Sequence, residues 1–149
     1  FLYAEAGFFA CFISRLYITQ DSANWIGTLD VNPWVVMGVV NVFLLIAGFF
    51  LPPVAVILMA APILLPIITT AGFDPIWFAV IVVKLIEIAV ITPPVGVNLF
   101  AVVAASQGQV KTAEVFRGVL PFVLIELVIL MILIAFPAIS TWLPSTMAG

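Results

Sequence analysis

Two adjacent prolines inside an apolar run are the feature of this sequence best suited to chemistry. Pro93 and Pro94 lie within the run 75–105. Neither has a backbone N–H, and each ring clashes with the preceding turn, so a continuous helix cannot pass through them. Thr92 is also disfavoured in the α conformation because a proline follows it. In lipid, broken backbone is tolerated only where protein buries it or water reaches it. The pair therefore predicts an ion or substrate site within a membrane helix.

A second proline pair, Pro52 and Pro53, also lies in uncharged surroundings. Such breaks free backbone carbonyls and create helix ends at membrane depth. Carbonyl oxygens and helix C-termini suit a hard cation such as Na⁺, whereas helix N-termini suit an anion. Polar oxygens and permissive backbone near the two pairs come from Gly48, Thr92, Gly96 and Asn98. The alternative interpretation is that these prolines only kink membrane helices.

Lys84, Glu87 and Glu126 are ionisable residues within apolar segments. Lys84 and Glu87 are spaced i, i+3, so they can pair on one helix face. A proton relay is the alternative, because ionisable groups within a membrane are costly and are usually functional. Glu126 lies in the last apolar segment, and we expect it to pair with a group in another part of a longer protein.

Composition identifies the class of protein. Hydrophobic residues make up 66% of the 149 residues and charged residues 7%, whereas a soluble domain is roughly half apolar and a quarter charged. We therefore expect an all-α integral membrane protein that is not an enzyme. The net charge of −3 argues against a nucleic-acid partner. With one Cys and no His, the usual zinc patterns are excluded. No organic cofactor is expected, and the sequence contains no Gly-rich phosphate loop with a Lys.

The chain divides into six segments. They are the end of a transmembrane helix (1–17), a polar interfacial arm (18–32), a helical hairpin (33–71), a broken transmembrane helix (72–105), a loop with a short amphipathic helix (106–118), and the last transmembrane helix with its tail (119–149). Phe1 opens within an apolar run without an initiator Met, which we interpret as a C-terminal fragment of a longer protein.

The hairpin shows no polar joint between its two helices. Gly48 to Val54 is apolar throughout, whereas an aqueous loop would normally contain Asn, Asp, Ser or Lys. A re-entrant hairpin is therefore favoured over two full spans. After the hairpin, Gly72 can end one helix, Asp74 can cap the next, and Pro75 fits its first turn.

The few charges suggest an orientation. By the positive-inside rule, the loop with Lys111 and Arg117 is cytoplasmic, and the loops with Asp21, Asp30 and Asp74 are external. Arg15 favours the opposite orientation, since it lies close to Asp21.

Four motifs carry a family resemblance. Ile91-Thr92-Pro93-Pro94-Val95-Gly96-Val97-Asn98-Leu99-Phe100 resembles the large membrane subunit of a tripartite ATP-independent periplasmic (TRAP) transporter. The other three motifs keep the family's order and spacing; they are Ala61-Pro62-Ile63-Leu64-Leu65-Pro66, Asp74-Pro75-Ile76-Trp77-Phe78 with Glu87-Ile88, and Arg117-Gly118-Val119-Leu120-Pro121-Phe122.

The resemblance implies half of an elevator-type Na⁺ symporter in the bacterial inner membrane. It would work with a small membrane subunit and an external binding protein that delivers an organic acid anion, such as a C4-dicarboxylate or a sialic-acid-like compound. The implied Na⁺ ligands are Gly48, Thr92, Pro93 and Gly96, and the implied substrate-binding residues are Pro52, Pro94 and Asn98.

The chain also departs from the family's pattern. Pro52 stands where many members have an acidic residue, Ala89 where many have Gly, and Leu85 where Asn is common. Two other functions stay open: a related anion symporter that needs no binding protein, and a membrane scaffold subunit that transports nothing.

Overall fold

The structure is a computed structural model that describes residues 7–8, 32–92, 96–107 and 109–147. The elements in this part of the chain are all helical, in agreement with the all-α prediction. They are α3 (Pro33–Phe50), α4 (Pro53–Thr70), α5 (Pro75–Ile91), α6 (Val97–Ala105), α7 (Thr112–Ala135) and α8 (Ala138–Met147). Most of the predicted segments 1–17 and 18–32 lies outside the described residues.

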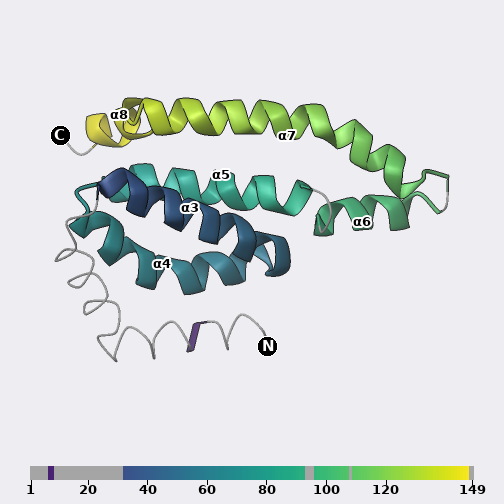
Figure 1. Ribbon diagram of the computed structural model, residues 1–149, viewed down its shortest axis with the longest axis horizontal. Coiled ribbons are helices and arrows are strands. Elements are labelled where there is room, and N and C mark those ends of the chain that lie inside the picture. Colours follow the sequence, from purple (N-terminus) through teal and green to yellow (C-terminus); the bar gives the residue numbers. More distant parts are fainter. Residues whose placement is uncertain (1–6, 9–31, 93–95, 108, 148–149) are drawn as a thin grey trace.

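Helix α5 is the centre of the bundle. It packs against α3, α4, α6, α7 and α8, with the α3–α4 hairpin on one side and α7 along the other (Figure 1). Most of its length is therefore apolar and buried. Trp77, Phe78 and Ile81 are fully buried and meet Leu44 of α3 and Ile68 of α4 in one hydrophobic core. The helix that ends at the proline pair is thus held on several sides.

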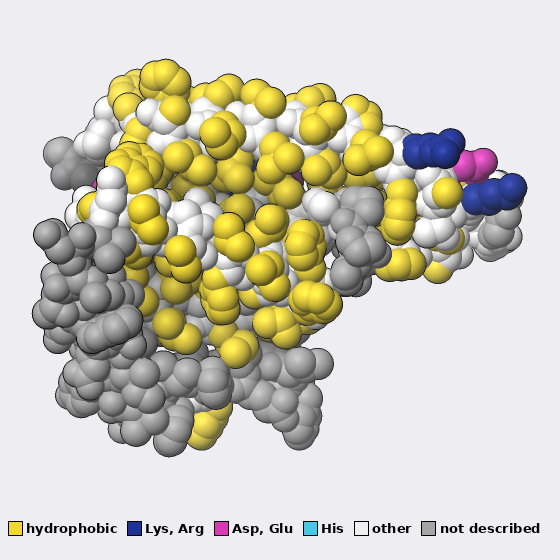
Figure 2. Space-filling view, viewed as in Figure 1, with side chains coloured by type: hydrophobic (Ala, Val, Ile, Leu, Met, Phe, Trp, Pro, Cys, Tyr) yellow, Lys and Arg dark blue, Asp and Glu magenta, His cyan; other side chains and the backbone are white. Residues whose placement is uncertain are grey.

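The outer surface is apolar as well. Large side chains such as Phe43 and Phe122 are more than half exposed, and Figure 2 shows hydrophobic side chains over most of the visible face. Three described helices, α3, α4 and α7, are long and apolar enough to cross a membrane. Charged side chains gather at the end of the molecule formed by the turn between α6 and α7 (Figure 2). These features are those of a multi-pass membrane protein.

The helix starts follow local sequence rules. Gly72 ends the α4 segment with a φ of 88°. The Asp74 carboxylate accepts hydrogen bonds from the backbone N–H groups of Ile76 and Trp77 at 2.8 and 2.9 Å, and Pro75 is the first residue of α5. The expected roles of Gly72, Asp74 and Pro75 are confirmed. Asn32 caps α3 in the same way, by accepting from the N–H of Trp34.

The last long helix differs from its expected boundaries. We expected a short amphipathic helix to end near residue 118 and a separate span to begin at 119. Thr112–Ala135 is instead one helix with Pro121 inside it. The tail beyond Pro137 forms the short helix α8, with Pro144 inside it.

One long-range hydrogen bond joins the start of α5 to the end of α7. The indole N–H of Trp77 donates to the carbonyl of Leu133 at 2.7 Å. In a regular helix this carbonyl would accept from the residue four positions on, but that residue is Pro137, which has no N–H. The buried Trp77 side chain therefore satisfies a carbonyl that the proline leaves free.

Candidate functional site

The helix break occurs where the proline pair predicts it. α5 ends at Ile91, and Thr92 is extended, with φ −90° and ψ 127°. α6 begins at Val97, after Gly96 at φ 20° and ψ 74°. The Thr92 hydroxyl donates to the carbonyl of Ile88 at 2.5 Å, and the Gly96 N–H donates to the carbonyl of Thr92 at 3.1 Å. The last turn of α5 and the start of α6 are thus joined through Thr92.

The end of α5 also has a carbonyl without a donor in its own helix. The Val90 carbonyl would accept from residue 93 or 94, and both are prolines. The neighbouring Ala89 carbonyl retains one donor, the Thr92 N–H at 3.3 Å. Val90 is itself buried. A carbonyl oxygen without a donor in its own helix is a suitable ligand for a hard cation.

The tip of the α3–α4 hairpin, where α3 ends at Phe50 and α4 begins at Pro53, lies level with this break. A Cβ atom added to Gly48 of α3 would be 2.7 Å from the Cβ of Ala89 in α5, so the two backbones approach closely there. α3 and α5 run in the same direction (Figure 1). Leu51 and Thr92 each follow this contact by three residues and are the C-caps of their helices. The C-terminal ends of α3 and α5 are therefore side by side.

Two helix N-termini begin at the same level. α4 starts after Pro52 and α6 starts after Gly96, and neither has a side-chain cap among the described residues. In contrast, Asn32 and Asp74 cap α3 and α5 at the other end of the hairpin. The uncapped ends leave backbone N–H groups pointing out of the helix, a suitable arrangement for binding an anion.

The structure brings part of the predicted site together. Thr92 and Gly96 are in direct contact, and Gly48 lies beside α5 one turn earlier. Pro52 is exposed at the hairpin tip, and Asn98 is exposed in the first turn of α6. Pro93 and Pro94 lie outside the described residues. The geometry thus joins three of the four predicted Na⁺ ligands, while the assignment of ligands itself stays a prediction.

An ion cluster links α5 to α7 away from the break. The Lys84 ammonium is 2.7 Å from a Glu87 carboxylate oxygen and 2.5 Å from one of Glu126. The pairing of Lys84 with Glu87 is confirmed. The expectation for Glu126 is wrong, because its partner is Lys84 on the neighbouring helix. Sequence spacing could not indicate this pair, since 42 positions separate its members.

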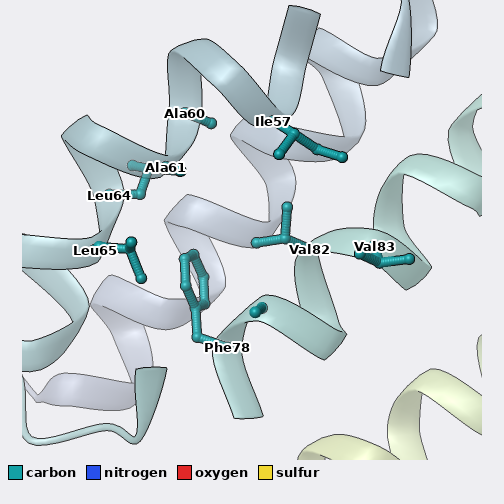
Figure 3. Close-up of a pocket in the computed structure, with 9 residues that line it drawn as sticks. Ile57, Ala60, Ala61, Leu64, Leu65, Phe78, Val82 and Val83 are labelled. Atoms are coloured by element: carbon teal, nitrogen blue, oxygen red, sulfur yellow. The ribbon is translucent and has the colours of Figure 1, made fainter. Parts of the chain in front are cut away.

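An apolar hollow lies between α4 and α5. It has a volume of about 120 Å³, and Figure 3 shows Ile57, Leu64, Phe78 and Val82 facing into it. All of its lining side chains are apolar, so it offers no partner for a charged ligand. The helix ends and the Lys84 cluster do supply polar groups.

These features define a class: a multi-pass α-helical membrane protein whose central helix is broken beside a hairpin tip. Residues 1–139 match the family described as "Tripartite ATP-independent periplasmic transporter, DctM component". The chain belongs to this family.

Three relatives illustrate the family. The chain is 44% identical over 145 residues to the C4-dicarboxylate TRAP transporter large permease protein DctM of Pseudomonas aeruginosa, a match that covers 97% of this chain and 34% of the relative. It is 30% identical over 141 residues to the sialic acid TRAP transporter large permease protein SiaM of Vibrio cholerae, covering 95% and 33%. It is 43% identical over 100 residues to the isethionate TRAP transporter permease protein DctMQ of Oleidesulfovibrio alaskensis, covering 67% and 15%. The chain spans about a third of the length of the first two relatives, and all three are described as transporter permeases.

Proposed function

We propose that this chain forms the part of a Na⁺-coupled symporter that binds the coupling ion and one side of an organic acid anion. The observation that carries the proposal is the meeting of four helix ends at one level. Two C-terminal ends, those of α3 and α5, carry partial negative charge and suit a cation. Two uncapped N-terminal ends, those of α4 and α6, suit a carboxylate.

In this proposal Na⁺ binds at the end of α5. The Thr92 hydroxyl oxygen and the carbonyls near the break are its ligands, together with backbone oxygens of α3 near Gly48. Pro93 belongs to the same ligand set and lies outside the described residues. Gly96 matters through its backbone, because a Cβ there would lie 2.9 Å from a methyl carbon of Leu99. A hard cation prefers such oxygen ligands, and a flexible cage of them can adapt to its size.

The substrate would bind beside the cation, at the N-terminal ends of α4 and α6. Pro52, Pro94 and Asn98 mark these two ends in the sequence. The free N–H groups there provide donors for a carboxylate without a basic side chain, and bound Na⁺ would favour the anion electrostatically. The relatives are named for C4-dicarboxylate and sialic acid, so we propose a substrate of this kind, an organic acid anion.

The lengths of the helices support a re-entrant hairpin. α3, α4 and α5 have 18, 18 and 17 residues, which is about 26 Å each at 1.5 Å per residue. α6 continues for nine residues past the break, or about 14 Å. The hairpin tip is level with the break, so it stops short of the end that α6 reaches. This supports a tip inside the membrane, as an elevator-type carrier would require.

The proposed setting follows from the family. The transporter would lie in the bacterial inner membrane and work with a small membrane subunit and an external substrate-binding protein. Lys111, the N-cap of α7, and Arg117, in the second turn of α7, would face the cytoplasm. A symporter without a binding protein and a scaffold that transports nothing are the competing functions.

Uptake by the full-length transporter in proteoliposomes separates these three functions. The proposal predicts uptake of a labelled C4-dicarboxylate or sialic acid that needs both an inward Na⁺ gradient and the binding protein. Uptake without the binding protein would favour the simpler symporter. Absence of uptake with either substrate, in a protein that is folded and bound to its small subunit, would favour the scaffold.

A further inference from the structure

Helix α7 spans the break in the central helix. It packs against α5 on one side of the break and against α6 on the other, as its course in Figure 1 shows. Phe116 meets Phe100 of α6 edge to face, with ring centroids 6.1 Å apart. Glu126 and the Leu133 carbonyl contact α5 through Lys84 and Trp77. α7 therefore spans the break at residues 92–96 and contacts the helix on each side of it.

The spacing of these contacts shows how α5 and α6 are placed along α7. From Trp77 to Lys84 is seven residues, and the matching step in α7, from Leu133 to Glu126, is also seven. From Lys84 to Phe100 is sixteen residues, whereas Glu126 to Phe116 is only ten. The ends of α5 and α6 are therefore closer together along α7 than a continuous helix of the same length would place them.

The ion pair between Lys84 and Glu126 lies nearer the break than the Trp77–Leu133 hydrogen bond, which is the other described polar contact between α5 and α7. The Lys84 and Glu126 side chains are about one-fifth exposed, whereas that of Glu87 is about half exposed. Apolar contacts tolerate sliding of one helix along another, whereas an ion pair between two partly buried side chains favours one register. Glu87 lies on the same helix as Lys84, so its contact cannot join α5 to α7.

We infer that Lys84 and Glu126 are positioning residues for the helix break. Their pair fixes the axial position and rotation of α5 two turns before Thr92, and α7 carries this constraint across to α6. The separation of the two helix ends, and hence the geometry of the carbonyls between them, depends on the pair. This inference rests on the proposed Na⁺ site at those carbonyls, although the constraint on the helix ends can be measured without it.

A matched pair of variants tests the inference. Glu126→Gln and Glu87→Gln each remove one carboxylate partner of Lys84, but only the first removes an ion pair between α5 and α7, while the Trp77–Leu133 hydrogen bond stays in place. We expect Glu126→Gln to raise the Na⁺ concentration for half-maximal uptake by about 2- to 30-fold, the range of long-range coupling effects. Glu87→Gln should leave it within about twofold of the parent. Equal effects of the two variants would overturn the inference.

The charge-swapped double variant Lys84→Glu/Glu126→Lys covers the case in which a single variant fails to fold. It keeps one ammonium and two carboxylates in the cluster with the link between α5 and α7 reversed. Recovery of folding and of the parent's Na⁺ concentration dependence supports the inference. Failure of the swap, with protein yield as low as that of Glu126→Gln, counts against it.

A distance measurement reads the same constraint without Na⁺ transport. Ile76 of α5 and Val102 of α6 are both exposed, so spin labels on Ile76→Cys and Val102→Cys in a Cys11→Ser background report the separation across the break. Glu126→Gln should broaden the distance distribution, and Glu87→Gln should not. A parent protein without Na⁺ dependence but with this pattern would refute the Na⁺ site and retain the positioning role. Unchanged distances in Glu126→Gln would refute the positioning role alone.

Discussion

The close approach of α3 to α5 beside the break can be tested with one methyl group. In Gly48→Ala the new Cβ would lie 2.7 Å from the Cβ of Ala89, whereas ordinary contacts begin at 3.4 Å. The two helices would have to separate by about 1 Å, and packed interiors resist such shifts. Overpacking of this kind costs about 1–3 kcal/mol, and the higher helix propensity of Ala offsets up to about 1 kcal/mol. We expect a net loss of about 1–2 kcal/mol in the free energy of unfolding.

A control substitution is available on the same helix, and a second substitution at the contact should restore the lost stability. A methyl group added at Gly38 of α3 would meet no atom within 4 Å, so Gly38→Ala should be neutral or slightly stabilising. In Gly48→Ala/Ala89→Gly the methyl group moves from α5 to α3, and the close contact becomes ordinary again. Stability should return to within about 0.5 kcal/mol of the parent, apart from the propensity terms, which cancel.

The assay is equilibrium unfolding of the full-length protein in detergent micelles, with the Na⁺ dependence of uptake as a second readout. If Gly48→Ala proves as harmless as Gly38→Ala, the two helices do not meet at this point. If Ala89→Gly fails to rescue Gly48→Ala, the loss has another cause. Either result would refute the placement of the hairpin tip beside the break.

Two further substitutions test how the N-terminal end of α5 is held. Trp77→Phe keeps the ring in the core but leaves the Leu133 carbonyl without its donor, so unfolding free energy should fall by about 1–3 kcal/mol, while Trp142→Phe, at an exposed position, should have little effect. Asp74→Ala removes the cap of α5 and should cost about 1 kcal/mol, whereas Asp74→Asn should retain most of it. Both series are read from unfolding midpoints in detergent, and equal values for each variant and its control would contradict the contacts described.

Local sequence rules predicted the course of the central helices well. The prolines at 52–53 and 93–94 set the ends of α3 and α5, and Asp74 with Pro75 set the start of α5, because capping and the missing N–H of proline act over a few residues. The expected boundary between residues 118 and 119 was wrong. Gly118 and Pro121 lie within α7, since a helix in a packed apolar bundle can accommodate one proline.

Contacts between distant segments could not be predicted in the same way. The pairing of Lys84 with Glu126 depends on the register of α5 against α7, which only tertiary packing defines. The hydrogen bond from Trp77 to the Leu133 carbonyl could not be predicted for the same reason. Pro137 shows only that this carbonyl has no donor in its own helix. For the candidate site, the sequence indicated Gly48, Thr92 and Gly96, but only the fold shows the ends of α3 and α5 at one level.

The central claim, that the break at Thr92 binds Na⁺, is tested most directly by comparing two threonines. The hydroxyls of Thr92 and Thr70 each donate to the carbonyl four residues back, at 2.5 and 2.8 Å, near the C-terminal end of a helix. Only Thr92 lies at the break. The measurement is the Na⁺ concentration for half-maximal uptake in proteoliposomes. Thr92→Ala should raise it about tenfold or more, as expected for loss of one ligand to a charged group, and Thr70→Ala should leave it unchanged. Unchanged Na⁺ activation in Thr92→Ala, with normal protein yield, would contradict the account.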